Sequence, residues 1–216
     1  MLIIFDLDDT LIDTTGSLKP ILFQNALKKM IDYGLDIADF QKSYNKLFEL
    51  SKKYKTSEDV LIDFLKNRSN IQKYLDVGIK EIYTTLPQDA KIEECKGASK
   101  ILKYLISSHT LALVSVGDRD RQFKKMEKAG IDYSIFCKII ISQDRNKKPW
   151  YKEIFEANSF PKEKVLVCGD KVDIDLHPAK ELGFTTVWKT NTQDENFQGI
   201  DFIINELEQL LGIVKE

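Results

Sequence analysis

A short polar stretch near the N-terminus has residue types and a spacing that suit acid–base or metal chemistry. The apolar run 2–5 has the length of a buried strand, and acidic and hydroxyl residues follow it directly: Asp6, Asp8, Asp9 and Thr10. Side chains two apart in an extended segment point the same way, so Asp6 and Asp8 can face one substrate. A solvated acidic turn gives the same short pattern, so this stretch alone leaves both interpretations open.

A serine provides a second polar group where another strand is expected to end. The predicted strand over residues 111–116 contains Ser115, and the amides of Val116 and Gly117 form a donor pair that suits a phosphate oxygen. A serine at a strand end is more often an ordinary turn residue. Alone, the serine is therefore a weak signal of a phosphate site.

A lysine and a second acidic loop complete the candidate set. Lys148 stands just before a proline that would start a helix; Lys147 adjoins it and leaves the choice open, although the Lys-Pro pairing favours Lys148. Asp170 follows a predicted buried strand, with Asp173 and Asp175 close behind. Three acids at the end of a buried strand repel one another unless a cation compensates them, which favours a metal site over a helix cap.

The elements that must position these residues form two kinds of pattern. Residues 14–86 show one-sided apolar stripes at helical spacing, which predict four helices packed as a small all-helical domain. We expect the first helix to begin after Ser17 and to end at Gly34, and the fourth, over residues 71–84, to stop before Pro87.

Helical and strand patterns alternate after Gly97. We expect strands at residues 111–116, 138–141, 165–168, 185–188 and 201–204, and helices that include 99–106, 150–157, 176–182 and 206–211. Strands separated by helices of this length predict a parallel sheet with helices on both faces. The sequence therefore predicts an α/β, Rossmann-like core from residues 1–13 and 87–216, with the helical domain 14–86 inserted after the first strand.

The composition excludes several classes of protein. The chain has 216 residues, 43% of them hydrophobic, and a net charge of −2 with no dense basic tract, so we expect no nucleic-acid partner. No stretch approaches the roughly 18 apolar residues of a membrane span. Three widely spaced cysteines predict free thiols in a reducing compartment, and His109 and His177 lack the spacing of metal ligands. We therefore expect a globular, cytoplasmic protein without a membrane partner.

Taken in order, these fragments resemble the haloacid dehalogenase superfamily of phosphohydrolases over nearly the whole chain. The stretches that carry the resemblance are Asp6-Leu7-Asp8-Asp9-Thr10, Ser115, Lys148-Pro149, and Gly169-Asp170 with Asp175. The helical insert after the first stretch resembles the cap of the phosphoglycolate-phosphatase-like branch. Val116 stands where the family often has Asn, and Lys171 replaces a frequent Ser. The resemblance therefore assigns neither the natural substrate nor the oligomeric state.

The resemblance implies a Mg²⁺-dependent phosphatase that cleaves a small phosphorylated metabolite. Asp6 would be the nucleophile that forms an aspartyl phosphate, and Asp8 the general acid and base. The implied metal site has Asp6, the Asp8 backbone carbonyl and Asp170 as ligands, with Asp175, or Asp173 as the alternative, orienting the waters of the metal. The implied phosphate-binding residues are Ser115, Val116 and Lys148. Because a phosphate monoester is a dianion, a carboxylate can attack it only when a cation offsets their repulsion.

Two other functions stay open at this point. A phosphoacceptor or binding module also gathers acids, a hydroxyl and a lysine around Mg²⁺, but a cap that closes over the site would obstruct a partner's surface. A dehalogenase of the same superfamily is the second alternative. Asp8 argues against it, because phosphoryl transfer needs this acid and dehalogenation does not.

Overall fold

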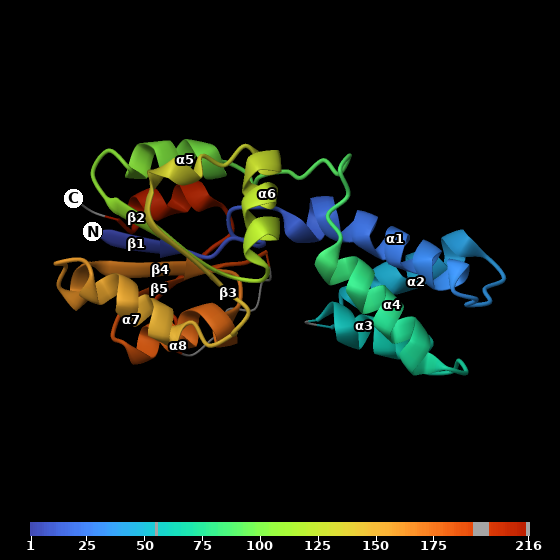
Figure 1. The fold of residues 1–216 in the computed structure, drawn as a ribbon. Coiled ribbons are helices and arrows are strands. Elements are labelled where there is room, and N and C mark those ends of the chain that lie inside the picture. Colours follow the sequence, from blue (N-terminus) through green and yellow to red (C-terminus); the bar gives the residue numbers. More distant parts are fainter. Residues whose placement is uncertain (55, 192–198, 215–216) are drawn as a thin grey trace. The chain divides into compact units, whose positions relative to one another are not determined.

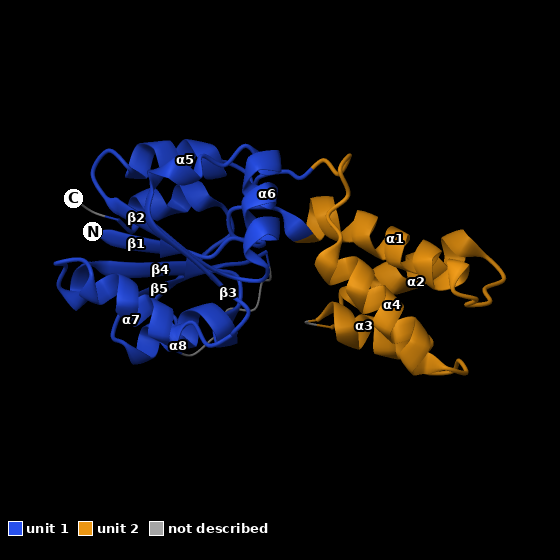
Figure 2. Ribbon diagram, viewed as in Figure 1, with its two compact units in different colours: residues 1–14, 92–216 blue, residues 15–91 orange. Residues whose placement is uncertain are grey.

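The computed structural model describes residues 1–54, 56–191 and 199–214, which form two compact units (Figure 2). The sheet unit comprises residues 1–14 and 92–216, and the helical unit comprises residues 15–91. The unit boundaries thus lie at 14/15 and 91/92, whereas we expected them at 13/14 and 86/87. The two connecting segments pair with each other: Asp13 N donates to Glu93 O (2.9 Å) and Cys95 N to Leu11 O (2.8 Å). This pairing ties the second segment to the sheet unit from residue 92 onward.

The sheet unit contains six parallel strands in the order β3-β2-β1-β4-β5-β6 (Figure 1). Their bounds are β1 Leu2–Phe5, β2 Thr110–Val116, β3 Phe136–Ser142, β4 Val165–Gly169, β5 Thr185–Lys189 and β6 Phe202–Ile204. β1 lies between β2 and β4, and all four of its residues are buried. This central position explains the apolar run 2–5, and the predicted α/β fold class is confirmed.

Helices cover both faces of the sheet, with α5 and α6 on one side and α7 and α8 on the other (Figure 1). Their bounds are α5 Ala98–Leu105, α6 Arg119–Ala129, α7 Lys148–Glu156 and α8 His177–Glu181. The face under α7 and α8 is a continuous core in which Ile4, Val167 and Tyr151 are buried together. All three cysteines are free thiols, as expected.

Two of the expected helices differ from the structure. The helix expected over 176–182 corresponds to α8, and the difference is that a π-helical turn, Val172–Leu176, directly precedes it. A proline in the first turn of α8 lacks the N–H that a continuous helix would use there. The last expected helix, 206–211, is a 3₁₀ helix, Leu207–Gly212. Its first turn is closed by reciprocal hydrogen bonds between Glu206 and Gln209.

The helical unit contains α1 Lys19–Asp32, α2 Phe40–Ser51, α3 Ser57–Leu65 and α4 Ile71–Thr84. The expected cap at Ser17 is wrong, because a π-helical turn, Thr14–Leu18, leads directly into α1. α4 packs closely against α3 and α1 at Gly78, where a Cβ atom would lie 2.9 Å from Leu61 Cδ1 and 3.3 Å from Met30 Sδ. Within the described ranges, every helix of the protein is too short or too polar to cross a bilayer.

Candidate functional site

Three adjacent strands bring the candidate residues to one edge of the sheet. β1 pairs in parallel with β2 on one side and with β4 on the other, so the carboxyl ends of all three strands meet at the same edge. Asp6 extends β1, and its N–H donates to Cys168 O (2.9 Å). Ser115 lies near the end of β2, and Asp170 follows β4. The structure therefore assembles acids and a hydroxyl that are distant from one another in the chain.

A buried lysine lies against the first of these acids. Lys147 Nζ is 2.6 Å from Asp6 Oδ1, 2.7 Å from Asp175 Oδ1 and 2.8 Å from Val114 O, and only 1% of its side chain is exposed. Burial alone would lower the pKa of this ammonium, but Asp175 and Asp6 raise it well above its usual value. Lys147 therefore remains a cation inside the site.

The placement expected for Lys148 is wrong. Lys148 Nζ pairs with Glu181 (2.7 Å) and its side chain is 44% exposed. The physical reason is the start of α7: Lys148 is its first residue and Lys147 precedes it, so consecutive side chains leave the helix in different directions. The proline at 149 begins the helix as expected, but the lysine that reaches the acids is one residue earlier than the one we favoured.

Asp6, Asp170 and Asp175 form an acidic cluster. Each offers a carboxylate oxygen, and the three oxygens lie within 4.8 Å of one another. Among the described residues, this is the group of possible metal ligands that the geometry brings together, and it contains no histidine or cysteine. Asp175 Oδ2 also accepts from the Lys171 amide (2.9 Å), whereas Asp173 is exposed and lies 3.7 Å from His177 Nδ1. Of the two alternatives, Asp175 is therefore the residue at the cluster.

A glycine makes this approach of Asp175 possible. A Cβ atom on Gly169 would lie 2.5 Å from Cβ of Asp175 and 2.6 Å from its Oδ2, distances that real side chains do not reach. The last residue of β4 must therefore lack a side chain. This explains, in terms of packing, the Gly-Asp pair that the sequence shows at this position.

The electrostatics of the cluster favour a bound cation. Burial raises the pKa of Asp6 to about 6 although Lys147 opposes the shift, and it raises the pKa of Asp170 to about 8 although Lys171 opposes it. Both shifts show that the nearby lysines do not fully compensate the charge of the carboxylates. Closely spaced carboxylate oxygens in this electrostatic state fit a hard divalent cation such as Mg²⁺.

Asp8 lies in a second and separate network. Its Oδ1 is 2.5 Å from Lys125 Nζ and also accepts from the Thr14 hydroxyl, and its Oδ2 accepts from Gln122 Nε2 (2.9 Å). Burial acts to raise the pKa of Asp8, but Lys125 and these hydrogen bonds hold it well below its usual value. Asp8 is therefore a carboxylate in an environment unlike that of Asp6.

Sequence reasoning missed both α6 residues of this network. Gln122 and Lys125 are three residues apart and therefore share one face of the helix, where both are buried with Met126. The stripe that should hold apolar side chains is thus partly polar. A polar residue on the inward stripe of an amphipathic helix was the available signal.

The serine and its neighbouring amides are placed as follows. Ser115 is buried, and its Oγ lies 2.7 Å from Gln122 Nε2. Gly117 N–H donates to Ser142 O (2.8 Å), so this amide belongs to the pairing with β3. Of the two expected amide donors, Gly117 is therefore not available to a phosphate oxygen.

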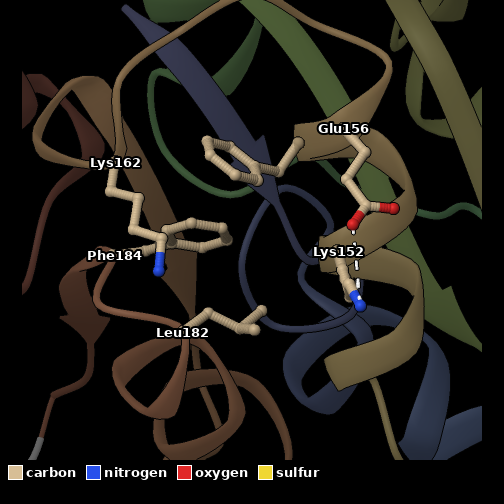
Figure 3. Close-up of a pocket in the computed structure, with 6 residues that line it drawn as sticks. Lys152, Glu156, Lys162, Leu182 and Phe184 are labelled. Carbon is tan, nitrogen blue, oxygen red and sulfur yellow. Dashed lines mark ion pairs between the residues drawn. The ribbon is translucent and has the colours of Figure 1, made fainter.

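A shallow pocket elsewhere in the sheet unit does not overlap this site (Figure 3). Its walls come from the end of α7 and from the segments that lead into β4 and β5, and they include Phe155, Leu182 and Phe184. These segments lie at the amino ends of the strands, opposite the acidic cluster. The acid of the pocket, Glu156, pairs with Lys152 (3.6 Å), so no acidic cluster is present there.

Comparisons with known proteins give consistent results. The family model described as haloacid dehalogenase-like hydrolase matches residues 3–189. Glyceraldehyde 3-phosphate phosphatases of Pyrococcus furiosus and Pyrococcus abyssi are 30% and 33% identical to this chain. These alignments cover 99% and 86% of this chain and 92% and 79% of the relatives.

The fold is also similar to that of solved structures. A haloacid dehalogenase-type hydrolase from Bacillus subtilis, determined bound to magnesium, matches with a TM-score of 0.64 and 19% identity. The match covers 98% of this chain and 97% of the other. At this level of identity, the likeness supports the fold of the whole chain.

Proposed function

The chain belongs to the haloacid dehalogenase-like hydrolase family, and we propose that it hydrolyses small phosphate monoesters with the help of Mg²⁺. One observation carries the proposal: Asp6 is a buried carboxylate that shares Lys147 with Asp175, while Asp8, two residues later, lies in an independent network. A nucleophile and an acid–base catalyst need different electrostatic environments, and these two acids have them. Without metal and substrate the pKa of Asp6 is raised and that of Asp8 is lowered, so the assigned roles also need the charge of a bound cation beside Asp6 and of the phosphate beside Asp8. The named relatives are phosphatases, which supports the same reaction class.

Four groups of this chain would hold the metal ion. They are the carboxylates of Asp6, Asp170 and Asp175, which the structure brings together, and the backbone carbonyl of Asp8, which the family resemblance implies. When bound, Mg²⁺ supplies positive charge that offsets the repulsion between the Asp6 carboxylate and a phosphate dianion. The raised pKa values of Asp6 and Asp170 are consistent with a site that needs this charge.

The chemistry divides between the two aspartates. A carboxylate oxygen of Asp6 forms a bond to phosphorus while the bond to the leaving oxygen breaks, and Asp8 gives that oxygen a proton. The negative charge of the bound phosphate favours the protonated form of Asp8 at this stage. A water molecule then attacks the phosphorus and gives its proton to Asp8. The bond between phosphorus and Asp6 breaks, and inorganic phosphate leaves.

The remaining residues bind the group that is transferred. Lys147 neutralises charge on Asp6 and on the phosphate, and it replaces Lys148 in this role because of its position. The hydroxyl of Ser115 and the amide of Val116 donate to the other phosphate oxygens. Ser115 and Val116 are the last two residues of β2 and Lys147 directly precedes α7, so all three groups lie at the same edge of the sheet.

The relatives also suggest which esters to examine first. They are named glyceraldehyde 3-phosphate phosphatases, so we extend the proposal to short aldose phosphates. The helical unit, residues 15–91, would act as the cap that excludes water and selects among these esters.

The test is a turnover assay over a panel of phosphate esters that includes glyceraldehyde 3-phosphate, in Mg²⁺ and in EDTA. We expect hydrolysis that EDTA abolishes and that added Mg²⁺ restores. Asp170→Asn should raise the Mg²⁺ concentration needed for half activity. Asp173→Asn, which removes an exposed acid from the same loop, should leave it unchanged. Undiminished activity in EDTA would contradict the assignment of the metal.

A further inference from the structure

Gln122 is a buried amide side chain to which the proposed reaction gives no role. It extends from α6 into the site and is 2% exposed. Its Nε2 lies 2.9 Å from Asp8 Oδ2, 2.7 Å from Ser115 Oγ and 3.2 Å from Val116 O. One nitrogen therefore contacts the acid–base residue, the phosphate-binding hydroxyl and the strand that carries that hydroxyl.

The chemistry of these partners determines the direction of each hydrogen bond. A backbone carbonyl and a carboxylate can only accept, so the nitrogen of Gln122, and not its oxygen, must face Val116 O and Asp8. That nitrogen has two hydrogens to give and no lone pair to accept with, and its two shortest contacts are to Ser115 Oγ and Asp8 Oδ2. Ser115 Oγ must therefore accept from Gln122. Its own hydrogen is then available to point at another acceptor, such as an oxygen of a bound phosphate.

The local backbone holds Gln122 in this orientation. Asp118 caps α6 by accepting from the backbone N–H of Arg121 (2.9 Å), and the backbone N–H of Gln122 donates to Asp118 O (3.0 Å). Gly117 has φ of +148°, and a Cβ atom there would lie 3.3 Å from Cδ of Gln122. The glycine thus leaves the space that the Gln122 side chain fills.

We propose that Gln122 is a positioning residue for phosphoryl transfer: it directs the Ser115 hydroxyl hydrogen toward the phosphate and holds Asp8 at its Oδ2 oxygen. Lys125, one helical turn later, holds the other carboxylate oxygen of Asp8. The inference rests on the proposed function, because it assigns Gln122 to the phosphate site of that reaction.

Two substitutions of similar size separate this role from simple packing. Gln122→Met keeps the length of the side chain but removes the donor. Gln122→Glu keeps the shape but replaces the donor with an acceptor, so the Ser115 hydrogen turns toward the new carboxylate and away from the phosphate. We expect inorganic phosphate, titrated calorimetrically in Mg²⁺, to bind about 10- to 100-fold more weakly to Gln122→Met. The Ser115 hydroxyl is then no longer directed at the phosphate, so its hydrogen bond to this charged group is lost. Binding to Gln122→Glu should be weaker again by about 10-fold, and KM for an activated ester should rise in parallel.

A matched control places the same new charge elsewhere. Gln72 on α4 is exposed, and its Nε2 donates to Asp76 Oδ1 (2.7 Å), so Gln72→Glu also sets a carboxylate beside a carboxylate. Phosphate binding by this variant should stay within about twofold of wild type. Thermal unfolding of every variant reports whether it is folded.

A double-mutant cycle with Ser115→Ala tests the route of the effect. If Gln122 acts through the serine hydroxyl, Gln122→Met should weaken phosphate binding by less than about threefold in the Ser115→Ala background. Equal losses with and without the hydroxyl, or equal phosphate binding by the Glu and Met variants, would overturn the inference. Failure of the wild-type protein to hydrolyse any ester would instead contradict the proposed function, because the phosphate titration does not depend on turnover.

Discussion

Asp6 and Asp8 leave the same strand end two residues apart, yet they lie in opposite electrostatic environments. Asp6 shares Lys147 with a second buried acid, and its pKa is raised. Asp8 has Lys125 as its own cation and accepts from Gln122 and Thr14, and its pKa is lowered. The comparison teaches that the surrounding helices, and not the acids themselves, give each carboxylate its chemical character.

The largest expected effect comes from replacing Lys147, the lysine that contacts the buried acids. Lys147→Met leaves Asp6 and Asp175 buried without their cation, which should lower the free energy of unfolding by about 3–5 kcal/mol. Turnover should fall by about 10²- to 10³-fold because the charge on the phosphate is no longer neutralised. Chemical denaturation and steady-state kinetics measure the two effects.

Lys148→Met is the control for the Lys147→Met substitution. Its ion pair with Glu181 is exposed, so the variant should lose less than about 1 kcal/mol and keep its turnover within about twofold. A larger loss of activity in Lys148→Met than in Lys147→Met would show that the lysine in the chemistry is the one the sequence favoured.

A smaller effect concerns the pH dependence of stability around Asp6 and Asp170. Their pKa values rise from an ordinary 3.8 to about 6 and about 8, so over this range the folded state keeps protons that the unfolded state has lost. Without metal, these groups therefore make folding less favourable as the pH rises from about 4 to about 8. Mg²⁺ binds the deprotonated acids, so its stabilising effect should grow over the same window, to about 2.7 kcal/mol at 100 times its Kd.

Thermal unfolding with and without Mg²⁺ at several pH values measures this effect. Asp170→Asn should make the Mg²⁺ effect smaller and confine its pH dependence to the range below about 6, where Asp6 still titrates, while Asp173→Asn should leave it unchanged. If Mg²⁺ stabilises the wild-type protein equally at pH 5 and pH 8, the pKa values of Asp6 and Asp170 are not raised, and the contrast between Asp6 and Asp8 fails.

The smallest effect tests the network of Asp8. Lys125→Met removes its cation, and at neutral pH this should cost about 1.5–3 kcal/mol, the range for a hydrogen bond to a charged group. Because the folded pKa of Asp8 is lowered, its contribution to stability is present above the unfolded value near 4 and is lost as the pH falls through the folded value. The difference between Lys125→Met and wild type should therefore narrow in acid.

Urea denaturation at pH 7 and at pH 3 gives this comparison, with Lys124→Met as the exposed control on the same helix. The control should match wild type at both values. A deficit in Lys125→Met that is equal at both pH values would indicate lost packing of the side chain and not a lost charge pair.

Much of the fold and of the candidate site could be predicted from the sequence. The apolar run 2–5, the alternation of strands and helices, and the acids at strand ends follow from periodicity and polarity, and they sufficed for the α/β fold class. Asp6, Asp8, Ser115 and Asp170 could be chosen as candidates because the carboxyl ends of parallel strands share an edge.

The rest depended on details that a linear pattern does not contain. The choice between Lys147 and Lys148 is decided by where α7 starts, and a proline at 149 is compatible with either lysine facing the site. The alternatives Asp173 and Asp175 both lie in a π-helical turn, and its geometry buries Asp175 while it leaves Asp173 exposed. Gln122 and Lys125 stand on the same helix face as Met126, but the sequence does not show that this face is turned toward Asp8; only the packing of α6 does.

The most direct test of the account is rapid-quench trapping of a phosphoenzyme in Asp6→Asn and Asp8→Asn with nitrophenyl phosphate and Mg²⁺. Asp8→Asn keeps the nucleophile and needs no proton for this leaving group, so it should give a burst and accumulate aspartyl phosphate, with steady-state turnover reduced by about 10²- to 10⁴-fold. Asp6→Asn should give neither a burst nor a phosphoenzyme by mass spectrometry. A phosphoenzyme in Asp6→Asn, or none in Asp8→Asn, would contradict the division of roles between the two aspartates.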